Sequence, residues 1–543
     1  MRSMIESHPL IHRNTIGDAL QRTAMQRPGQ IALKYRERCW SYQALDRAAN
    51  RVANHLLALG LNKADRVAAY GKNSDAYLIL WLACTRAGLI HVPVNYSLTE
   101  HELAYVLDQS GARALFVDDS LKSLVDSIPG QRQLAIRGSL HSNETTSGRS
   151  DILAVATSSG CDQPPAIDIA ETDVVQILYT SGTTSDPKGA MHTHRSLMAE
   201  YSSCLLHLDI RSSDRCLAAL PLYHSAQMHV FTMPALLAGA YSCLTDTPTP
   251  EEILRLLKGE QLNSFFAPPT VWIALLRHEQ FVEAQLQHVQ KLYYGASIMP
   301  EPIARELGER LPRSGLYNCY GQSEIAPLAT VLTPEEHRER PTSCGRPVVN
   351  VLTRIIDPAT GEDCAPGVPG ELVHRSPQLM VGYWQKPDET AEAFAGGWFH
   401  SGDLGYRDEQ GYIWIVDRIK DIVNTGGVLV ASRDVEEALY RHPHVAEVAV
   451  IGVPDHKWIE AITAVVVLKQ NIAPDAQALL HHARAHLAPF KVPKHVHFVE
   501  QLPKNSSGKL LKRVLRMQFG APAESRLGEL AADSLQQTQA SAR

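Results

Sequence analysis

The alternation of helical and strand-like patterns through the first 120 residues is the feature that most constrains the fold. Residues 18–60 have the pattern of a helix, a pair of strands and an amphipathic helix that ends near Gly60. Thr99 and Glu102 then form a capping box at the start of another helix, and ARALFVDD has the pattern of a short buried strand. Such alternation predicts an α/β fold in which helices flank the sheets.

The most apolar segment, YLILWLACTRAGLIHVPV from Tyr77, is interrupted by Arg86 and Gly88. It is too short to cross a bilayer, so we interpret it as a core helix followed by a buried strand. The N-terminal residues contain no apolar stretch typical of a signal peptide. We therefore expect no integral membrane association.

Length and composition set further limits. A chain of 543 residues exceeds what one core supports, so two or more domains are expected. The formal net charge of −6 does not favour a nucleic-acid partner. Nine cysteines are scattered without a C-x-x-C pair, which argues against a disulfide framework and predicts a cytoplasmic location.

The segment YTSGTTSDPKG, residues 179–189, combines hydroxyls, one glycine-rich turn and a single cation, Lys188. Backbone N–H groups, hydroxyls and an ammonium suit a phosphate chain. We expect the loop between the strand DVVQILYT and the helix HRSLMAEYSSCLLHL, as in many α/β phosphate sites. It does not match the P-loop pattern, and a flexible surface loop is the alternative reading of this segment alone.

Four later segments argue against the reading of residues 179–189 as a flexible surface loop. They are YNCYGQSEIAP, WFHSGDLGY, DRIKDIVNTGG and LPKNSSGKLLKR. Together with the loop, they match in order the motifs of a known family. The chain resembles the adenylate-forming superfamily, which comprises acyl-CoA synthetases, peptide-synthetase adenylation domains and beetle luciferases. The resemblance spans roughly Asp18 to Met517.

The sequence predicts two domains and a tail. Past Asp417 short strands and a helix indicate a small α+β unit, and the resemblance implies that this unit is mobile. We predict a large N-terminal domain of several subdomains with helix-flanked sheets. The predicted limits are an adenylation domain over residues 1–417, a hinge over 418–420, a C-terminal domain over 421–520 that carries Lys509, and a polar tail over 521–543. The Ser/Thr/Gly-rich stretch from Gly138 to about Pro165 is predicted to be a loop.

The resemblance implies a two-step ligase reaction. A carboxylate attacks the α-phosphate of ATP to form an acyl-AMP and pyrophosphate, and a thiol then displaces AMP. The implied co-substrates are ATP, Mg²⁺ and CoA, and the remaining substrate is a small carboxylic acid. Two alternatives stay open: an enzyme that loads a separate carrier protein, and a nucleotide-binding relative that retains one half-reaction. A homodimer is a further expectation.

The resemblance also implies roles for individual residues. Lys509, Glu324 and Lys188 are the expected catalytic residues; Glu324 is also the expected Mg²⁺ ligand, and Lys420 the expected hinge. Tyr320 is expected to stack on adenine, and Asp403 and Arg418 to contact the ribose. The full set of expected nucleotide-binding residues is Thr180, Ser181, Gly182, Thr183, Thr184, Lys188, Ala296, Tyr320, Gly321, Ser323, Asp403 and Arg418.

The acid pocket is predicted less sharply. The resemblance implies that a ring near His224 lines it, and Tyr294 and Gly295 occupy a position that would shape it. Apolar residues around these positions favour a medium- or long-chain fatty acid, with an aryl acid also considered. Val428 and Leu429 replace a polar pair common in the family, so the motifs support adenylation more directly than CoA transfer. His192 and His194 are interpreted as structural histidines on a strand.

Overall fold

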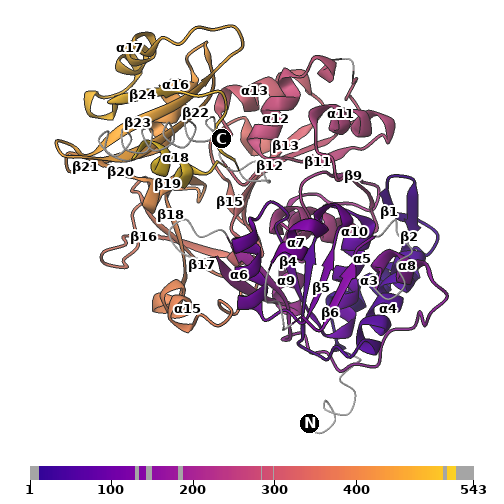
Figure 1. The fold of residues 1–543 in the computed structure, drawn as a ribbon. Helices are drawn as coiled ribbons and strands as arrows, with labels where there is room; N and C mark the ends of the chain where they lie inside the picture. The colour runs from indigo at the N-terminus through magenta and orange to yellow at the C-terminus, as the bar shows by residue number, and fades with distance from the viewer. Residues whose placement is uncertain are drawn as a thin grey trace, which may run out of the picture. The chain divides into compact units, whose positions relative to one another are not determined.

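A computed structural model describes residues 12–128, 134–141, 150–180, 187–282, 284–297, 299–504 and 510–520 (Figure 1). The chain divides into two compact units. The first contains residues 1–367, 372–401 and 407–414, and the second contains residues 368–371, 402–406 and 415–543. This division does not test the domain limits predicted from the sequence, which remain a prediction.

The first unit contains a six-stranded sheet in the order β6-β5-β3-β4-β7-β8. Its pairs are parallel except for the hairpin pair β7 and β8. Residues 181–187 are therefore flanked in the sequence by two antiparallel strands. The prediction of a strand before them and a helix after them is incomplete, because the strand that carries His192 comes first and pairs with β7. The strands are β3 (Arg66–Tyr70), β4 (Ile90–Val94), β5 (Ala114–Val117), β6 (Ile136–Ser139), β7 (Val174–Thr180) and β8 (Lys188–Thr193).

A nine-stranded sheet in the order β15-β14-β13-β12-β11-β9-β10-β1-β2 belongs to the same unit. Its central pairs are parallel and its edges antiparallel. Its strands are β1 (Ile31–Tyr35), β2 (Arg38–Ser41), β9 (Arg215–Ala218), β10 (Tyr241–Leu244), β11 (Ser264–Phe266), β12 (Lys291–Gly295), β13 (Gly315–Gly321), β14 (Leu328–Leu332) and β15 (Arg346–Pro347).

Two further sheets complete the fold. A four-stranded sheet has the order β16-β17-β18-β19. A five-stranded sheet in the second unit has the order β21-β20-β23-β22, with β24 parallel to β23. The strands are β16 (Leu352–Ile356), β17 (Gly370–Arg375), β18 (Phe399–Arg407), β19 (Ile413–Arg418), β20 (Val423–Thr425), β21 (Val428–Val430), β22 (Val445–Asp455), β23 (Ile459–Leu468) and β24 (His495–Phe498).

The helices confirm the predicted α/β class. Those of the first unit are α3 (Ile16–Gln26), α4 (Tyr42–Ala58), α5 (Asp75–Ala87), α6 (Glu100–Ser110), α7 (Lys122–Ser127), α8 (Ile152–Thr157), α9 (His194–His207), the π-helix η2 (Ala226–Thr232), α10 (Met233–Ala238), α11 (Pro250–Gly259), α12 (Pro269–Arg277), α13 (Glu301–Arg310), α14 (Pro334–His337) and α15 (Pro387–Ala393). Those of the second unit are α16 (Ser432–Tyr440), α17 (Ala476–His486) and α18 (Lys512–Phe519).

Local sequence signals account for several of these elements. The apolar run from Tyr77 forms α5 and β4 as predicted, and Thr99 with Glu102 caps α6. The prediction of a loop from Gly138 to Pro165 is wrong in part, because α8 lies within it. The Asp151 side chain caps α8, whose residues Ile152, Leu153 and Ala156 are buried, so a short amphipathic turn persists inside a polar stretch.

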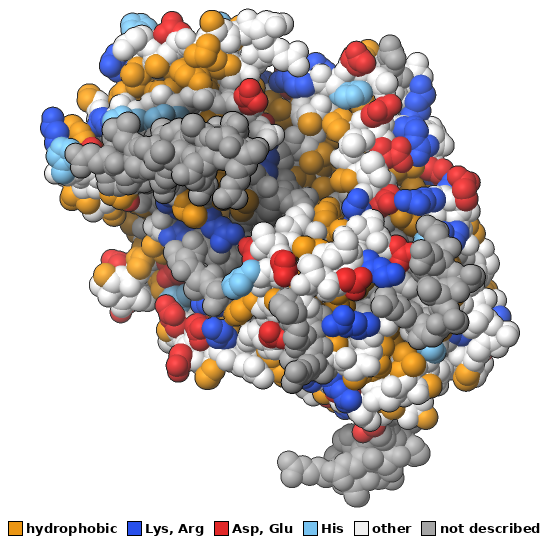
Figure 2. Space-filling model, in the orientation of Figure 1, with side chains coloured by type: hydrophobic (Ala, Val, Ile, Leu, Met, Phe, Trp, Pro, Cys, Tyr) orange, Lys and Arg blue, Asp and Glu red, His pale blue; other side chains and the backbone are white. Residues whose placement is uncertain are grey.

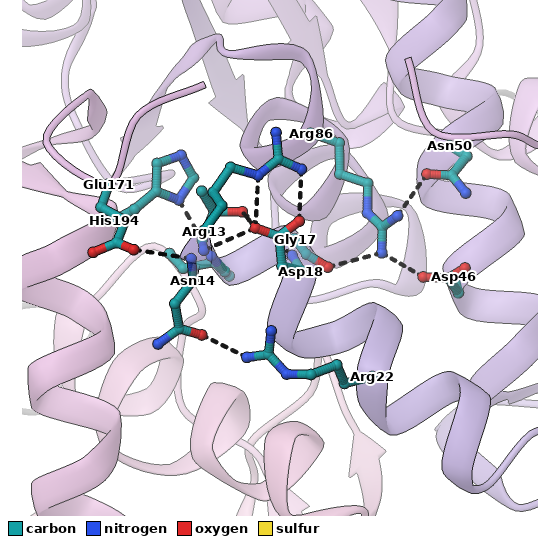
Figure 3. A network of polar contacts seen from close by, with 12 residues as sticks. Arg13, Asn14, Gly17, Asp18, Arg22, Asp46, Asn50, Arg86, Glu171 and His194 are labelled. Atoms are coloured by element: carbon teal, nitrogen blue, oxygen red, sulfur yellow. Dashed lines mark hydrogen bonds and ion pairs between the residues drawn. The ribbon is translucent and has the colours of Figure 1, made fainter. Parts of the chain in front are cut away.

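Arg86, the charge that interrupts the apolar run, is buried at the end of α5. Its guanidinium donates to Asn50 Oδ1 at 2.8 Å and to the Gly17 carbonyl oxygen at 3.1 Å, and it pairs with Asp46 (Figure 3). A buried arginine needs such partners, because an unpaired charge in the interior is costly. This side chain therefore joins α3, α4 and α5, the helices that pack around the principal core cluster.

On the face drawn in Figure 2, acidic and basic side chains are interspersed rather than gathered into a field of one sign. This distribution agrees with the small net charge of the chain. Among the described helices, none has both the length and the apolarity needed to cross a membrane.

Candidate active site

Lys188, Tyr383 and Glu324 lie together in the first unit although they are far apart in the sequence. The segment that carries Tyr383 lies alongside β8. The Trp384 N–H donates to the Gly189 carbonyl oxygen at 2.7 Å, and Tyr383 forms an antiparallel β-bridge with Ala190. Lys188 Nζ lies 5.3 Å from the centre of the Tyr383 ring. The Tyr383 hydroxyl in turn donates to Glu324 Oε1 at 3.0 Å.

This contact affects the tyrosine as well as the carboxylate. Burial, and then the neighbouring Glu324 charge, raise the pKa of Tyr383 well above its ordinary value. The hydroxyl therefore keeps its proton and serves as a hydrogen-bond donor that orients the carboxylate. The arrangement places one cation and one oriented carboxylate together, the charges that a phosphate–Mg²⁺ complex requires.

Glu324 lies on a short 3₁₀ turn, Ser323–Ile325, between β13 and β14. Gly321, the last residue of β13, is required there, because a Cβ at that position would lie 1.7 Å from the Pro327 carbonyl oxygen. The Ser323 and Ser225 hydroxyls are hydrogen-bonded at 3.0 Å. This contact links the Glu324 turn to the first residue before η2.

His192 supports the same turn from β8. Its Nε2 donates to the Ser323 carbonyl oxygen at 2.7 Å, and burial lowers the pKa of His192 to about 4. The neutral ring therefore holds the turn over the whole physiological pH range. The prediction that His194 shares the strand is wrong, because β8 ends at Thr193, which caps α9, and His194 is the first residue of that helix.

A buried polar cluster packs beneath the turn. Glu200 accepts from the Leu328 N–H at 3.0 Å and from Gln378 Nε2 at 2.6 Å, and Gln378 Nε2 also donates to the Leu328 carbonyl oxygen at 2.9 Å. The Ser203 hydroxyl donates to Gln378 Oε1 at 2.6 Å. Burial raises the pKa of Glu200 well above its ordinary value. The cluster fixes the start of β14 and hence the position of Glu324.

The strands β12 and β13 carry the other predicted residues of this unit. Gly295 pairs with Cys319 in parallel register, and a Cβ on Gly295 would lie 2.2 Å from the Cys319 carbonyl oxygen. Ala296 follows in the left-handed region, with φ of 64°. Tyr320, half-buried, packs against the third core cluster. The roles of these residues stay predictions.

Tyr294 and His224 lie in different surroundings. The Tyr294 ring is buried in the second core cluster, and its hydroxyl is hydrogen-bonded to His337 Nε2 at 3.1 Å. His224 is half-buried, and its Nδ1 accepts from the Ala226 N–H at 3.3 Å, next to the start of η2. A pocket role for either residue stays a prediction.

Asp403, Arg418 and Lys420 belong to the second unit. Asp403 is buried, and its Oδ1 lies 3.1 Å from Arg418 Nε. Lys420 lies exposed on the 3₁₀ turn Ile419–Asp421 that follows β19. The ion pair holds the carboxylate in one orientation, as a ribose-binding acid would require.

Asp417, the residue before Arg418, is hydrogen-bonded to α16, which in turn contacts α18. Asp417 Oδ2 accepts from the Ser432 N–H at 2.7 Å and from its hydroxyl at 2.6 Å. Lys512 Nζ donates to the same hydroxyl at 2.6 Å and pairs with Glu436 at 2.8 Å. The strand that ends at Arg418 is therefore fixed to the body of the second unit.

Several predicted residues lie outside the described part of the chain: Ser181, Gly182, Thr183, Thr184 and Lys509. Thr180 and Lys188, which flank the loop, are described, and the Thr180 hydroxyl donates to the Lys188 carbonyl oxygen at 3.4 Å. Tyr383, Ser225 and His192 have contacts at the site that sequence reasoning did not predict. No local motif surrounds Tyr383, and only its pairing with β8 brings it to the site.

Comparison with known proteins agrees with this geometry. The AMP-binding enzyme family matches residues 20–384, and the AMP-binding enzyme C-terminal domain matches residues 434–509. The chain belongs to the family of AMP-binding enzymes. It is an adenylate-forming enzyme of the acyl-CoA synthetase type, an AMP-forming acid–thiol ligase that uses ATP, Mg²⁺ and CoA.

Individual relatives cover nearly the whole chain. A feruloyl-CoA synthase of Amycolatopsis sp is 36% identical over 92% of this chain and 98% of its own length. A long-chain-fatty-acid–CoA ligase of Mycobacterium tuberculosis is 32% identical over 89% of this chain and 93% of its own. The structure of ATP-bound MatB from Rhodopseudomonas palustris is 31% identical, with a TM-score of 0.85 over 93% of this chain and 99% of that one.

Proposed function

We propose that this enzyme converts a free carboxylic acid with an apolar body into its CoA thioester through an acyl-AMP. A carboxylate oxygen of the acid bonds to the α-phosphorus of ATP, the bond to the β-phosphate breaks, and pyrophosphate leaves. The CoA sulfur then bonds to the acyl carbon, and AMP leaves with the former carboxylate oxygen. The observation that supports this proposal best is the grouping of Lys188, Tyr383 and Glu324.

The first step brings two anions together, so its residues must neutralise charge. Lys188 is suited to the β- and γ-phosphates, together with the hydroxyls of residues 180–184. Glu324 is suited to Mg²⁺, because this ion commonly takes one or two carboxylates and completes its shell with water and phosphate oxygens. Among the described residues, no three potential ligand side chains gather as a metal cage, which agrees with that mode. Lys509 is assigned to the reacting carboxylate and α-phosphate.

The nucleotide assignments extend to the second unit. Asp403, oriented by Arg418, is suited to accept hydrogen bonds from the two ribose hydroxyls. Tyr320 offers a ring for the adenine, with Gly321, Ser323 and Ala296 beside it. Lys420 is assigned to the hinge at which the C-terminal domain moves between the two half-reactions. At such a position backbone freedom matters more than charge.

The enzyme uses CoA as an acceptor, and a separate carrier protein is a second candidate acceptor that the sequence left open. Val428 and Leu429 are exposed on β21, where the family commonly has a polar pair. An apolar hairpin tip is compatible with either acceptor, because both present a pantetheine arm. The cytoplasmic location and the homodimer inferred from the sequence also remain predictions.

Two classes of carboxylic acid are candidates for the substrate. The fatty acid predicted from the sequence is supported by the apolar third core cluster and by the name of the ligase from Mycobacterium tuberculosis. An aryl acid is supported by the aromatic side chains of the same cluster and by the name of the 36% identical feruloyl-CoA synthase.

The deciding experiment measures AMP release from ATP and Mg²⁺ over a panel of fatty and aryl acids, with and without CoA. Release that requires one acid class and CoA supports the proposal and identifies the class. Acid-dependent pyrophosphate exchange without CoA turnover points to a carrier protein. The absence of acid-dependent signal in both assays contradicts adenylation of either class.

A further inference from the structure

Two polar side chains of helix α6 contact the residues that flank the segment 181–186. They are Tyr105 and Gln109, which are four residues apart and therefore project from the same face of the helix. The Tyr105 hydroxyl donates to the Pro187 carbonyl oxygen at 3.3 Å, after the segment. Gln109 Oε1 accepts from the Tyr179 hydroxyl, before the segment. One face of α6 therefore contacts the chain on both sides of the predicted phosphate loop.

Gln109 also contacts the segment that carries Tyr383. Its Nε2 donates to the Trp384 carbonyl oxygen at 2.9 Å, and the Trp384 indole N–H donates to the Gln109 carbonyl oxygen at 3.1 Å. The backbone N–H of Trp384 is bonded to Gly189 on β8. Three hydrogen bonds therefore hold Trp384, the neighbour of Tyr383, between α6 and β8.

Arg66, on β3, joins Trp384 to the C-terminal end of α6. Its guanidinium carbon lies 5.5 Å from the centre of the Trp384 ring. Its Nε and Nη2 donate to the carbonyl oxygens of Ser110 and Gly111 at 2.9 and 2.7 Å. The last carbonyls of a helix have no partner within the helix, and a cation is favourable there. The end of α6 that carries Gln109 is thus itself fixed in place.

The two ends of the Gln109 carboxamide have different tasks. Nε2 is the donor toward Trp384, and Oε1 is the acceptor toward Tyr179. Burial raises the pKa of Tyr179 above its ordinary value, so its hydroxyl keeps the proton that it donates. In the sequence Tyr179 directly precedes Thr180, and Trp384 directly follows Tyr383. One side chain therefore links the neighbours of two site residues that lie far apart in the chain.

We propose that Gln109 is a positioning residue for the binding of the β- and γ-phosphates of ATP. By holding Tyr179 and Trp384 together, it fixes the spacing between β7 and the segment that orients Glu324. Lys188, on the strand paired with β7, and Glu324 are the residues proposed for phosphate and Mg²⁺. Gln109 is assigned no contact with the nucleotide and acts through these neighbours. The inference deepens the proposed function and rests on it.

The test compares the affinities for ATP–Mg²⁺ and for AMP, because AMP has no β- or γ-phosphate. Both are measured by calorimetric titration of the full chain without an acid, so that no adenylate forms. In Gln109→Met we expect Kd for ATP–Mg²⁺ to rise by about fivefold or more, because the Trp384 carbonyl and the Tyr179 hydroxyl both lose a partner. Kd for AMP should stay close to its wild-type value. A general loss of structure would weaken both nucleotides alike.

Gln30→Met is the matched control. Gln30 Nε2 donates to the Gly239 carbonyl oxygen at 2.6 Å, and its Oε1 accepts from Arg27 at 3.1 Å. The variant therefore removes the same two kinds of contact elsewhere in the first unit. We expect it to keep the wild-type Kd for both nucleotides.

Tyr179→Phe is the milder variant, and it decides the question if Gln109→Met does not fold. It keeps the ring and removes only the hydrogen bond to Gln109, so Kd for ATP–Mg²⁺ should rise by a smaller factor, again without a change for AMP. A ratio of the two Kd values that is unchanged in the folded variants, or an equal loss of both affinities, overturns the inference. Failure of the proposed function is recognised separately, because the wild type itself would then bind no ATP–Mg²⁺, and the inference would fall with it.

Discussion

The Tyr383 hydroxyl donates to Glu324 Oε1 at 3.0 Å, and the same ring lies beside the Lys188 ammonium. Tyr383 thus connects the proposed Mg²⁺ ligand with the proposed phosphate-binding cation. We expect Tyr383→Phe to slow adenylation by about tenfold or more, because a hydrogen bond to a charged group is worth about 1.5–3 kcal/mol. The ring remains in this variant, so Lys188 keeps its neighbour.

The measurement is acid-dependent ATP–pyrophosphate exchange as a function of Mg²⁺ concentration. A positioning role predicts that half-maximal exchange needs more Mg²⁺ in Tyr383→Phe. Tyr70→Phe is the control, because it removes another buried tyrosine hydroxyl, which donates to the Tyr96 carbonyl oxygen at 3.2 Å. An unchanged Mg²⁺ dependence would contradict this role.

Asp403→Ala is expected to weaken nucleotide binding about tenfold or more, since it removes a buried carboxylate from the proposed ribose contact. It also leaves Arg418 without that partner. Calorimetric titration with AMP measures the affinity directly, independent of chemistry. Asp408→Ala, in a turn of the first unit, serves as a control. Wild-type affinity for AMP in Asp403→Ala would count against the ribose contact.

Lys509→Ala is expected to separate the two half-reactions. The lysine is assigned to the carboxylate and α-phosphate of the first step only, so adenylation should fall by about a hundredfold or more. A preformed acyl-AMP should still be converted to the thioester at close to the wild-type rate. Single-turnover assays of each half measure this. Equal loss of both halves would refute the assignment.

Glu200 makes the stability of the first unit depend on pH. Burial raises its folded-state pKa, so the folded protein binds this proton more tightly than the unfolded chain does. The contribution is complete below the ordinary glutamate pKa of about 4.3 and declines as pH rises toward the folded value. Glu200→Gln removes this decline, because the amide stays neutral.

Urea unfolding between about pH 5 and pH 8 tests this sign. The difference in unfolding free energy between Glu200→Gln and the wild type should move in favour of the variant as pH rises. Glu200→Ala should lose about 1–3 kcal/mol at every pH, because the Leu328 N–H and Gln378 lose their acceptor. Glu409→Gln, at an exposed position, should show no trend. Parallel pH profiles of the unfolding free energy for Glu200→Gln and the wild type would disprove the role of Glu200 in this pH dependence.

Short-range signals predicted much of the fold. The capping box at Thr99, the apolar run from Tyr77 and the strand before residue 181 depend on neighbouring residues, and the structure confirms them. A strand carrying His192 was expected after the loop, but its antiparallel pairing with β7 was not, because GAMHT carries only a short strand pattern beside a strong helix signal. Helix α8 was missed because only six residues carry its apolar face.

The candidate site likewise contains residues that local motifs predicted and residues that they did not. Motifs identified Lys188, Glu324 and Asp403 as candidates, because each lies in a short segment with a recognisable pattern. Tyr383 contacts Glu324 across 59 residues of sequence, and Gln378 contacts Glu200 across 178. Pairings of this kind depend on tertiary packing, which no local pattern encodes.

The π-helix η2 also bears on how this enzyme could acquire new substrates. A π-turn is an α-helix with one extra residue, and each residue of an α-helix advances the side chains by about 100°. Deletion of a single residue within Ala226–Thr232 would therefore rearrange the side chains inside the π-turn, while the helix faces on either side of it and the strands β9 to β12 stay in register. This turn could thus be remodelled by a change in chain length, with Lys188 and Glu324 untouched.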